Sequence, residues 1–212
     1  MLLSVLIGCS LDRVDIVEGP HCAPDTVGYV VDTLDGDTVD VVTFASLDLG
    51  QADLAVNDTG GDTGSTGGET QDVRVVRVRM LGVDAPEIAH DSTEVADCYG
   101  DEAAEWARMS LLGRQVLLSF DATCEDTYGR ALAYVFLTDD GDTYDLGDCV
   151  AGTCTVPDDT SASGVVLMND IVIREGYARV YKDFDDIRLA DLLYGAESAA
   201  KEDNRGLWSV CE

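Results

Sequence analysis

Alternating apolar and polar positions predict β-strands in several parts of this chain. The most informative stretch is VRVVRVRMLGVDAPE, residues 73–87, where mostly β-branched apolar residues alternate with three arginines. The strand pattern then breaks at Gly82, Asp84 and Pro86. Pro86 has no amide hydrogen and disfavours helical backbone at Ala85, so the strand must end there. The same pattern predicts further strands at residues 26–34, 38–47, 115–121 and 130–138.

Apolar residues at helical spacing predict three helices. The expected helices cover residues 101–112, 165–175 and 185–203. Gly113 and Gly176 follow the first two, where a left-handed residue commonly closes a helix. Because five antiparallel strands are too few for a sandwich, the predicted fold class is α+β, a five-stranded OB-fold-like β-barrel with three α-helices.

The composition is that of one folded domain. With 212 residues and 46% hydrophobic content the chain can bury a sizeable core, and no run reaches the roughly 18 apolar residues of a membrane-spanning helix. We expect residues 1–25 to be a signal and polar tether and residues 26–212 to be the domain. Two acidic, turn-rich insertions at about 48–72 and 139–164 are expected to be loops within it.

The first ten residues, MLLSVLIGCS, resemble a bacterial lipoprotein signal. In such a signal the cysteine after a small residue is lipidated, which makes Cys9 the expected lipidation site. We therefore expect an extracytoplasmic monomer that is secreted or held at the membrane by this anchor. The segment is short and lacks a positive n-region, which a truncated start would explain; the alternatives to lipidation are a mistaken start and a buried first strand.

Six cysteines remain after Cys9, and an even number in an extracytoplasmic protein suggests disulfides. Buried free thiols are the alternative, and the absence of CxxC spacing argues against a thiolate zinc site. Six cysteines allow 15 pairings. The pairs that we expect are Cys149–Cys154, Cys98–Cys124 and Cys22–Cys211.

The charge of the chain is extreme. The 42 acidic and 13 basic residues give a formal net charge of −29, and Lys182 and Lys201 are the only lysines. We interpret this bias as adaptation to high salt, which screens repulsion between carboxylates.

Candidate chemistry gathers in three turns. Arg79 lies near the end of the central strand, and Asp84 and Glu87 follow it within eight residues. The turn Asp35-Gly36-Asp37 joins the first two strands, and DTYG at 126–129 leads into Arg130 at the start of another strand. A metal and a phosphate could both be bound where such cations and carboxylates meet.

Several sequence blocks, taken together, resemble the staphylococcal nuclease (thermonuclease) family. They are LDGDTV at 34–39, RMLGVDAPE at 79–87, DTYGRALAY at 126–134, MNDIVIREGYARVY at 168–181 and GLWS at 206–209. The resemblance implies a five-stranded barrel with three helices. It also implies a calcium-dependent phosphodiesterase that acts on DNA and RNA and leaves 3′-phosphates.

Site roles follow from the same resemblance. It implies that Asp37, Asp84 and the backbone carbonyl of Ala85 bind Ca²⁺, with alanine standing where the family usually has threonine. Glu87 falls on the general base. The remaining matches are the phosphate-binding Arg79 and Arg130 and the nucleotide-contacting Tyr128 and Tyr181. The chain departs from the family at a nucleotide-site lysine, which is Thr127 here, and at a second tyrosine, replaced by Lys182 or Phe184.

The chemistry of these residue types agrees with this reading. Calcium takes hard oxygen ligands, a glutamate can deprotonate a water for in-line attack, and the planar fork of arginine suits phosphate oxygens. Nucleic-acid binding normally needs a basic surface, so the acidic residues must lie away from a locally positive cleft, or the substrate is not a long polyanion.

Each residue also has a simpler interpretation. Arg79 could be a cross-strand ion-pair partner, Glu87 a solvated charge, Asp84 a turn cap and Arg130 a partner of Asp126. For the whole protein, the alternatives are a catalytically inactive lipoprotein module that binds calcium or an oligonucleotide, and a surface lipoprotein stabilised by calcium.

Overall fold

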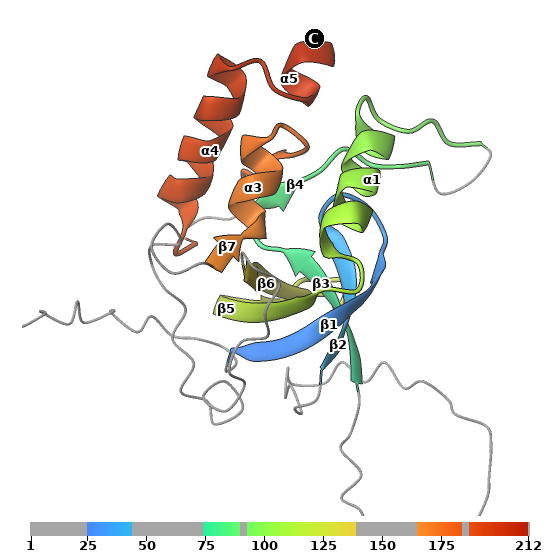
Figure 1. The fold of residues 1–212 in the computed structure, drawn as a ribbon, viewed down its shortest axis with the longest axis vertical. Helices are drawn as coiled ribbons and strands as arrows, with labels where there is room; N and C mark the ends of the chain where they lie inside the picture. Colours follow the sequence, from blue (N-terminus) through green and yellow to red (C-terminus); the bar gives the residue numbers. More distant parts are fainter. Residues whose placement is uncertain (1–24, 44–73, 90–92, 139–164, 184–186, 212) are drawn as a thin grey trace, which may run out of the picture.

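The described part of this computed structural model, residues 25–43, 74–89, 93–138, 165–183 and 187–211, is built around a closed β-barrel (Figure 1). Its strands are hydrogen-bonded in the order β3-β2-β1-β5-β6, and a parallel pairing of β3 with β6 closes the ring. The barrel strands are β1 (Thr26–Thr33), β2 (Thr38–Thr43), β3 (Arg74–Met80), β5 (Gln115–Glu125) and β6 (Ala131–Thr138).

Three short strands complete the sheets. β7 (Val165–Leu167) pairs with the C-terminal end of β6, and β4 (Val83–Asp84) pairs with β8 (Arg179–Val180). β4 is separate from β3 because Gly82 between them has a φ of +77°, a left-handed conformation that breaks a strand. The predicted break at Gly82 is therefore confirmed, and it directs Asp84 away from the barrel wall.

Alternation along the strands builds the core. On β2, Val39 and Val41 are fully buried, while Asp40 between them is on the other face and pairs with Arg77 of β3. The interior of the barrel contains Val78, Met80 and Phe120.

The helices cover one end of the barrel, as Figure 1 shows. α1 packs against β1, while α3 packs against both β6 and α4. Among the described residues they are α1 (Gly100–Leu111), α3 (Met168–Arg174), α4 (Ala190–Glu202) and the short α5 (Leu207–Val210). The predicted class, α+β with a five-stranded OB-fold-like barrel and three α-helices, is confirmed.

Two helix boundaries differ from the prediction. Residues 165–167 form β7 instead of the first turn of a helix, because they extend the sheet beside β6. The last long helix begins at Ala190 and not at residue 185. The backbone N–H groups of Arg188 and Leu189 instead donate to the Asp121 carboxylate and the Tyr134 hydroxyl, which tie this segment to the barrel. The predicted loops at 48–72 and 139–164, and the tether up to residue 24, lie outside the described residues.

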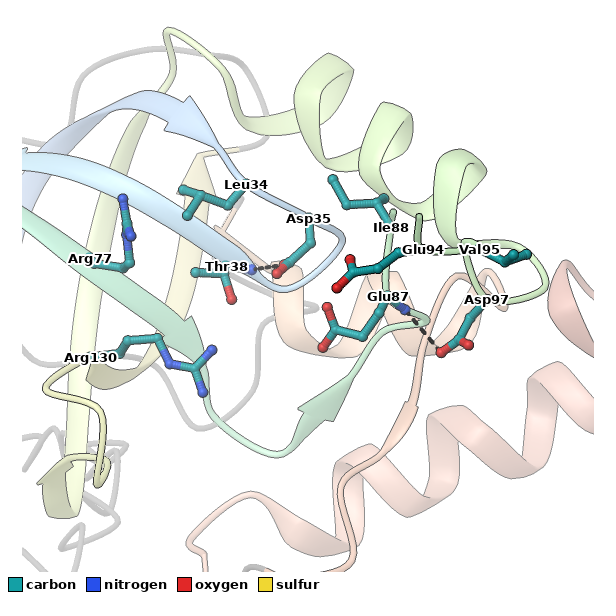
Figure 2. Close-up of a pocket in the computed structure, with 10 residues that line it drawn as sticks. All are labelled: Leu34, Asp35, Thr38, Arg77, Glu87, Ile88, Glu94, Val95, Asp97 and Arg130. Carbon is teal, nitrogen blue, oxygen red and sulfur yellow. Dashed lines mark hydrogen bonds between the residues drawn. The ribbon is translucent and has the colours of Figure 1, made fainter. Parts of the chain in front are cut away.

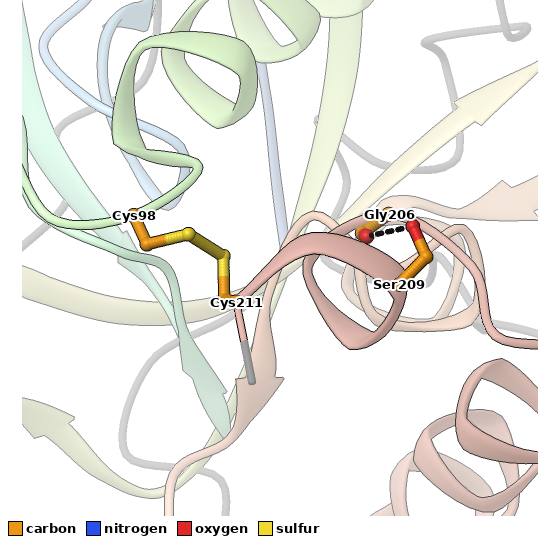
Figure 3. The surroundings of a disulfide bond; sticks show 4 residues. All are labelled: Cys98, Gly206, Ser209 and Cys211. Atoms are coloured by element: carbon orange, nitrogen blue, oxygen red, sulfur yellow. Dashed lines mark hydrogen bonds between the residues drawn. A yellow bond between two sulfur atoms is a disulfide. The ribbon is translucent and has the colours of Figure 1, made fainter.

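The disulfide prediction was partly wrong. Cys98 pairs with Cys211, with their Cα atoms 5.7 Å apart and 113 positions apart in sequence (Figure 3). This bond excludes the expected pairs Cys98–Cys124 and Cys22–Cys211. It joins the loop before α1 to the end of α5, two segments whose proximity only the fold determines. Cys124 is also disulfide-bonded, and the expected pair Cys149–Cys154 lies outside the described residues.

Within the described ranges, none of the helices combines the length and the apolar character needed to cross a membrane.

Candidate active site

The turn between β1 and β2 contributes two aspartates with different tasks. Asp35 organises the turn itself, because its Oδ1 accepts hydrogen bonds from the backbone N–H groups of Asp37 at 2.9 Å and Thr38 at 2.6 Å. Asp37 instead reaches across to other elements. Asp35 thus stabilises the turn, whereas the Asp37 carboxylate contacts Arg79 and Ala85 outside it.

Asp37 is almost fully buried, with 1% of its surface exposed. Its Oδ1 accepts from Arg79 Nη1 and, at 3.0 Å, from the Thr38 hydroxyl; its Oδ2 accepts from the Ala85 N–H at 2.8 Å. Burial raises the pKa of Asp37 to about 8, and the Arg79 guanidinium offsets only part of that effect. This carboxylate would therefore be stabilised in its charged form by a further cation.

Arg79 links the turn to β4. Its Nη2 donates to the Val83 carbonyl at 3.1 Å and lies 3.7 Å from Asp84 Oδ1. The Asp84 side chain is half exposed, whereas Arg79 is nearly buried. The structure therefore brings Asp37, Arg79, Asp84 and the backbone of Ala85 together.

Glu87 is held by its main chain and leaves its side chain exposed. Its N–H donates to Asp97 Oδ2 at 3.3 Å, and its carbonyl accepts from the Asp97 N–H at 2.9 Å. Gly100 packs directly against this carbonyl, and a side chain at position 100 would collide with it. Asp97 went unrecognised in the sequence because it lies in a segment without strand or helix periodicity, and Gly100 because it only opens α1.

A pocket of about 690 Å³ is lined by side chains from all three predicted turns, among them Glu87 and Arg130, but not by Asp37, Arg79 or Asp84 (Figure 2). Figure 2 shows Arg77 and Arg130 on one side of it and Asp35, Glu87 and Glu94 on the other. Leu34, Thr38, Ile88, Val95 and Asp97 complete the lining.

Arg130 is oriented by Asp126, as the simpler interpretation expected. Its Nε donates to Asp126 Oδ2 at 2.6 Å, and its backbone N–H donates to Asp126 Oδ1 at 2.9 Å. Burial alone would raise the pKa of Asp126, but hydrogen bonds from Arg130 and Tyr128 hold that pKa below its usual value. The pairing leaves the Arg130 guanidinium at the pocket, so holding Arg130 in place and exposing it to a ligand are compatible.

The two tyrosines lie in different surroundings. Tyr128 is 84% exposed, and its ring lies 5.5 Å from the Arg130 guanidinium. Tyr181 follows β8, where its N–H donates to the Gly82 carbonyl at 3.0 Å. Tyr181 is not among the residues that line the pocket.

The described residues contain no group of three or more His, Cys, Asp or Glu side chains arranged to hold a metal ion. The donor set nevertheless fits a hard divalent cation. Asp37 and Asp84 supply carboxylate oxygens on either side of Arg79, and burial disfavours the charged form of Asp37, which a bound cation would stabilise. Calcium accepts such a set when water and substrate oxygens fill its remaining positions.

Comparison with known proteins agrees with the geometry. The sequence model described as "Staphylococcal nuclease homologue" matches residues 77–210. An uncharacterized protein of Methanocaldococcus jannaschii is 28% identical over 150 residues, which cover 63% of this chain and 61% of that protein. A thermonuclease of Staphylococcus hyicus is 27% identical over 139 residues, 66% of each chain. A probable endonuclease of Kluyveromyces lactis is 32% identical over 134 residues, 63% of this chain and 42% of the relative. The matches span less than two thirds of the length of each relative.

Proposed function

Because the chain belongs to the staphylococcal nuclease family, we propose that it is a calcium-dependent phosphodiesterase that hydrolyses DNA, RNA or both. One observation carries this proposal. Asp37 in the β1–β2 turn contacts Arg79 near the end of β3, Arg79 also approaches Asp84 at the end of β4, and Glu87 and Arg130 line the pocket that includes the neighbouring Thr38.

Each of these residues has a role that its surroundings support. Glu87, which is exposed and held through its main chain, would deprotonate a water for in-line attack on phosphorus. Arg130 at the pocket and Arg79 in the Asp37 cluster would bind the phosphate oxygens and stabilise the charge that develops in the transition state. A calcium ion held by Asp37, Asp84 and the Ala85 carbonyl would polarise the phosphate. The products would carry 3′-phosphate ends.

Tyr128 and Tyr181 are proposed to contact the nucleotide. Tyr128 suits this role because its exposed ring lies beside the Arg130 guanidinium, next to the expected position of the phosphate.

The acidic character of the chain does not prevent nucleic-acid binding. Arg77 and Arg130 lie on the same side of the pocket, so the cleft has local cations although the chain carries a net charge of −29. We expect weak substrate binding that depends on short-range hydrogen bonds, because long-range attraction is absent.

We also propose that the protein works as a monomer outside the cytoplasm, secreted or anchored through a lipid on Cys9. The bond between Cys98 and Cys211 supports an oxidising compartment. Cys9 itself lies outside the described residues, and mass spectrometry of the N-terminal peptide tests the lipid directly.

Replacing Glu87 tests the mechanism. Wild-type protein should cleave denatured DNA with calcium in high salt and lose this activity when calcium is chelated. Glu87→Gln should cleave about 10²–10⁴-fold more slowly, because it lacks the base. Glu102→Gln, an exposed carboxylate change on α1, is the matched control and should behave like wild type.

Equal cleavage by wild type and Glu87→Gln would exclude this mechanism. If wild type binds calcium or oligonucleotides but never cuts them, the chain is an inactive binding module of the same family.

A further inference from the structure

Arg77 is a pocket arginine with no assigned role. It lies on β3 two residues before Arg79, and side chains two residues apart on a strand share a face. It lines the same pocket as Glu87 and Arg130 (Figure 2). Its side chain is 42% exposed, whereas that of Arg79 is 10% exposed. Arg77 is therefore the more accessible of two cations on the same strand.

A cross-strand aspartate fixes the orientation of Arg77. Asp40 is directly opposite it on β2, and Arg77 donates from Nε at 2.8 Å and from Nη2 at 2.9 Å to the two Asp40 oxygens. These bonds use two of the five N–H donors of the guanidinium, so three remain for a ligand. Arg130 and Arg79 are also held by aspartates, but through one guanidinium bond each, from Nε to Asp126 and from Nη1 to Asp37. Arg77 thus shares an aspartate partner with the two arginines proposed to bind the scissile phosphate, and its own partner fixes it through two bonds.

We propose that Arg77 binds the phosphate next to the scissile one, so that the pocket accepts two consecutive phosphates of a single nucleic-acid strand. The proposal rests on the proposed function for the position of the scissile phosphate. Two residues along a strand cover about 6.8 Å, which is similar to the step between successive phosphates in an extended polynucleotide. Because Asp40 holds the fork in place before substrate arrives, little side-chain entropy is lost on binding.

The net charge of the Arg77–Asp40 pair determines how Arg77 can contribute to substrate binding. Arg77 and Asp40 together are neutral, so Arg77 contributes through short charge-assisted hydrogen bonds and not through attraction at a distance. A substrate with one phosphodiester cannot reach both Arg77 and the catalytic cluster. Only a longer strand should depend on Arg77.

The test compares a dinucleotide with a short single-stranded oligonucleotide. Arg77→Gln should raise KM for the oligonucleotide about tenfold, as expected for a lost hydrogen bond to a charged group, with kcat nearly unchanged. Cleavage of the dinucleotide should not change. The dependence of oligonucleotide binding on log salt should become shallower by about one unit or slightly less.

Arg174 provides the matched control. It is clamped by Asp170 with the same two-bond geometry, and its side chain is 35% exposed, but it lies on α3 and does not line the pocket. Arg174→Gln should leave both substrates unaffected. Arg77→Lys keeps an ion pair with Asp40 but loses the fork, and it replaces Arg77→Gln if the latter lowers the unfolding temperature.

The double variant Arg77→Gln/Asp40→Asn separates binding from charge neutralisation. If Arg77 binds phosphate, the double variant stays as weak as Arg77→Gln. Recovery of wild-type affinity in the double variant would show that Arg77 only neutralises Asp40. The proposal would also be overturned if Arg77→Gln raised KM equally for the dinucleotide and the oligonucleotide. If wild type cleaves neither substrate, the proposed function fails, while oligonucleotide affinity measured by fluorescence anisotropy still decides the role of Arg77.

Discussion

Arginines of the candidate site are held by aspartates on the barrel or in its turns. Asp37, Asp40 and Asp126 each accept at least one bond from a guanidinium, and each of them is mostly buried. An aspartate that orients an arginine lowers the entropy lost when phosphate binds, but it also cancels long-range attraction. Under the proposed function, specificity for phosphate therefore comes from geometry more than from net charge.

Asp126 offers a test at the scale of one residue. Asp126→Asn should cost about 1 kcal/mol at neutral pH, because it weakens the bonds from Arg130 and from the Tyr128 N–H. The folded state lowers the pKa of Asp126, so its contribution is present above the unfolded value of 3.8 and is lost as the pH falls through the folded value. Urea unfolding of both proteins should therefore converge in acid, and a difference that persists there would assign the effect to packing.

A disulfide connects the end of α5 to the segment that holds the Glu87 main chain. Cys211 follows α5 and forms a disulfide with Cys98 (Figure 3). The residue before Cys98 is Asp97, which is hydrogen-bonded to the main chain of Glu87. The covalent bond therefore supports the loop that carries the proposed base.

Removing this bond should affect both stability and rate. The double variant Cys98→Ser/Cys211→Ser should lose about 2–5 kcal/mol in the free energy of unfolding, since the bond closes a loop between residues 113 positions apart. The rate constant kcat should fall with it, because Asp97 is less constrained. Both proteins are compared without reductant, so that the bridge at Cys124 stays intact. An unchanged kcat would limit the bond to a stabilising role.

The sequence predicted what depends on local pattern. Alternating valines located the barrel strands, and Gly82 with Pro86 located the break that turns Asp84 out of the wall. It did not predict the Cys98–Cys211 bond, because six cysteines allow 15 pairings and the choice depends on which distant segments the fold brings together. It also left Arg77 as one of three similar arginines, since only the register with Asp40 and the pocket distinguish it.

At the scale of the whole molecule, the net charge sets two opposite responses to salt. Most basic side chains in the described part of the chain already contact a carboxylate, as in Arg108–Glu105 and Lys201–Glu197. The excess of 42 acidic over 13 basic residues therefore remains as mutual repulsion. Salt shortens the range of this repulsion, from roughly 10 Å at 0.1 M to about 3 Å at 1 M.

We therefore expect the unfolding temperature to rise steadily with salt while affinity for an oligonucleotide falls, since counterion release opposes binding. Scanning calorimetry and anisotropy in the same salt series measure the two responses. Neutralising Asp101 and Glu102, exposed acids on α1, should weaken the rise of the unfolding temperature with salt. The fall of oligonucleotide affinity with salt should stay unchanged. The same salt slope of unfolding in that variant and in wild type would mean that salt acts by exclusion from apolar surface and not by screening.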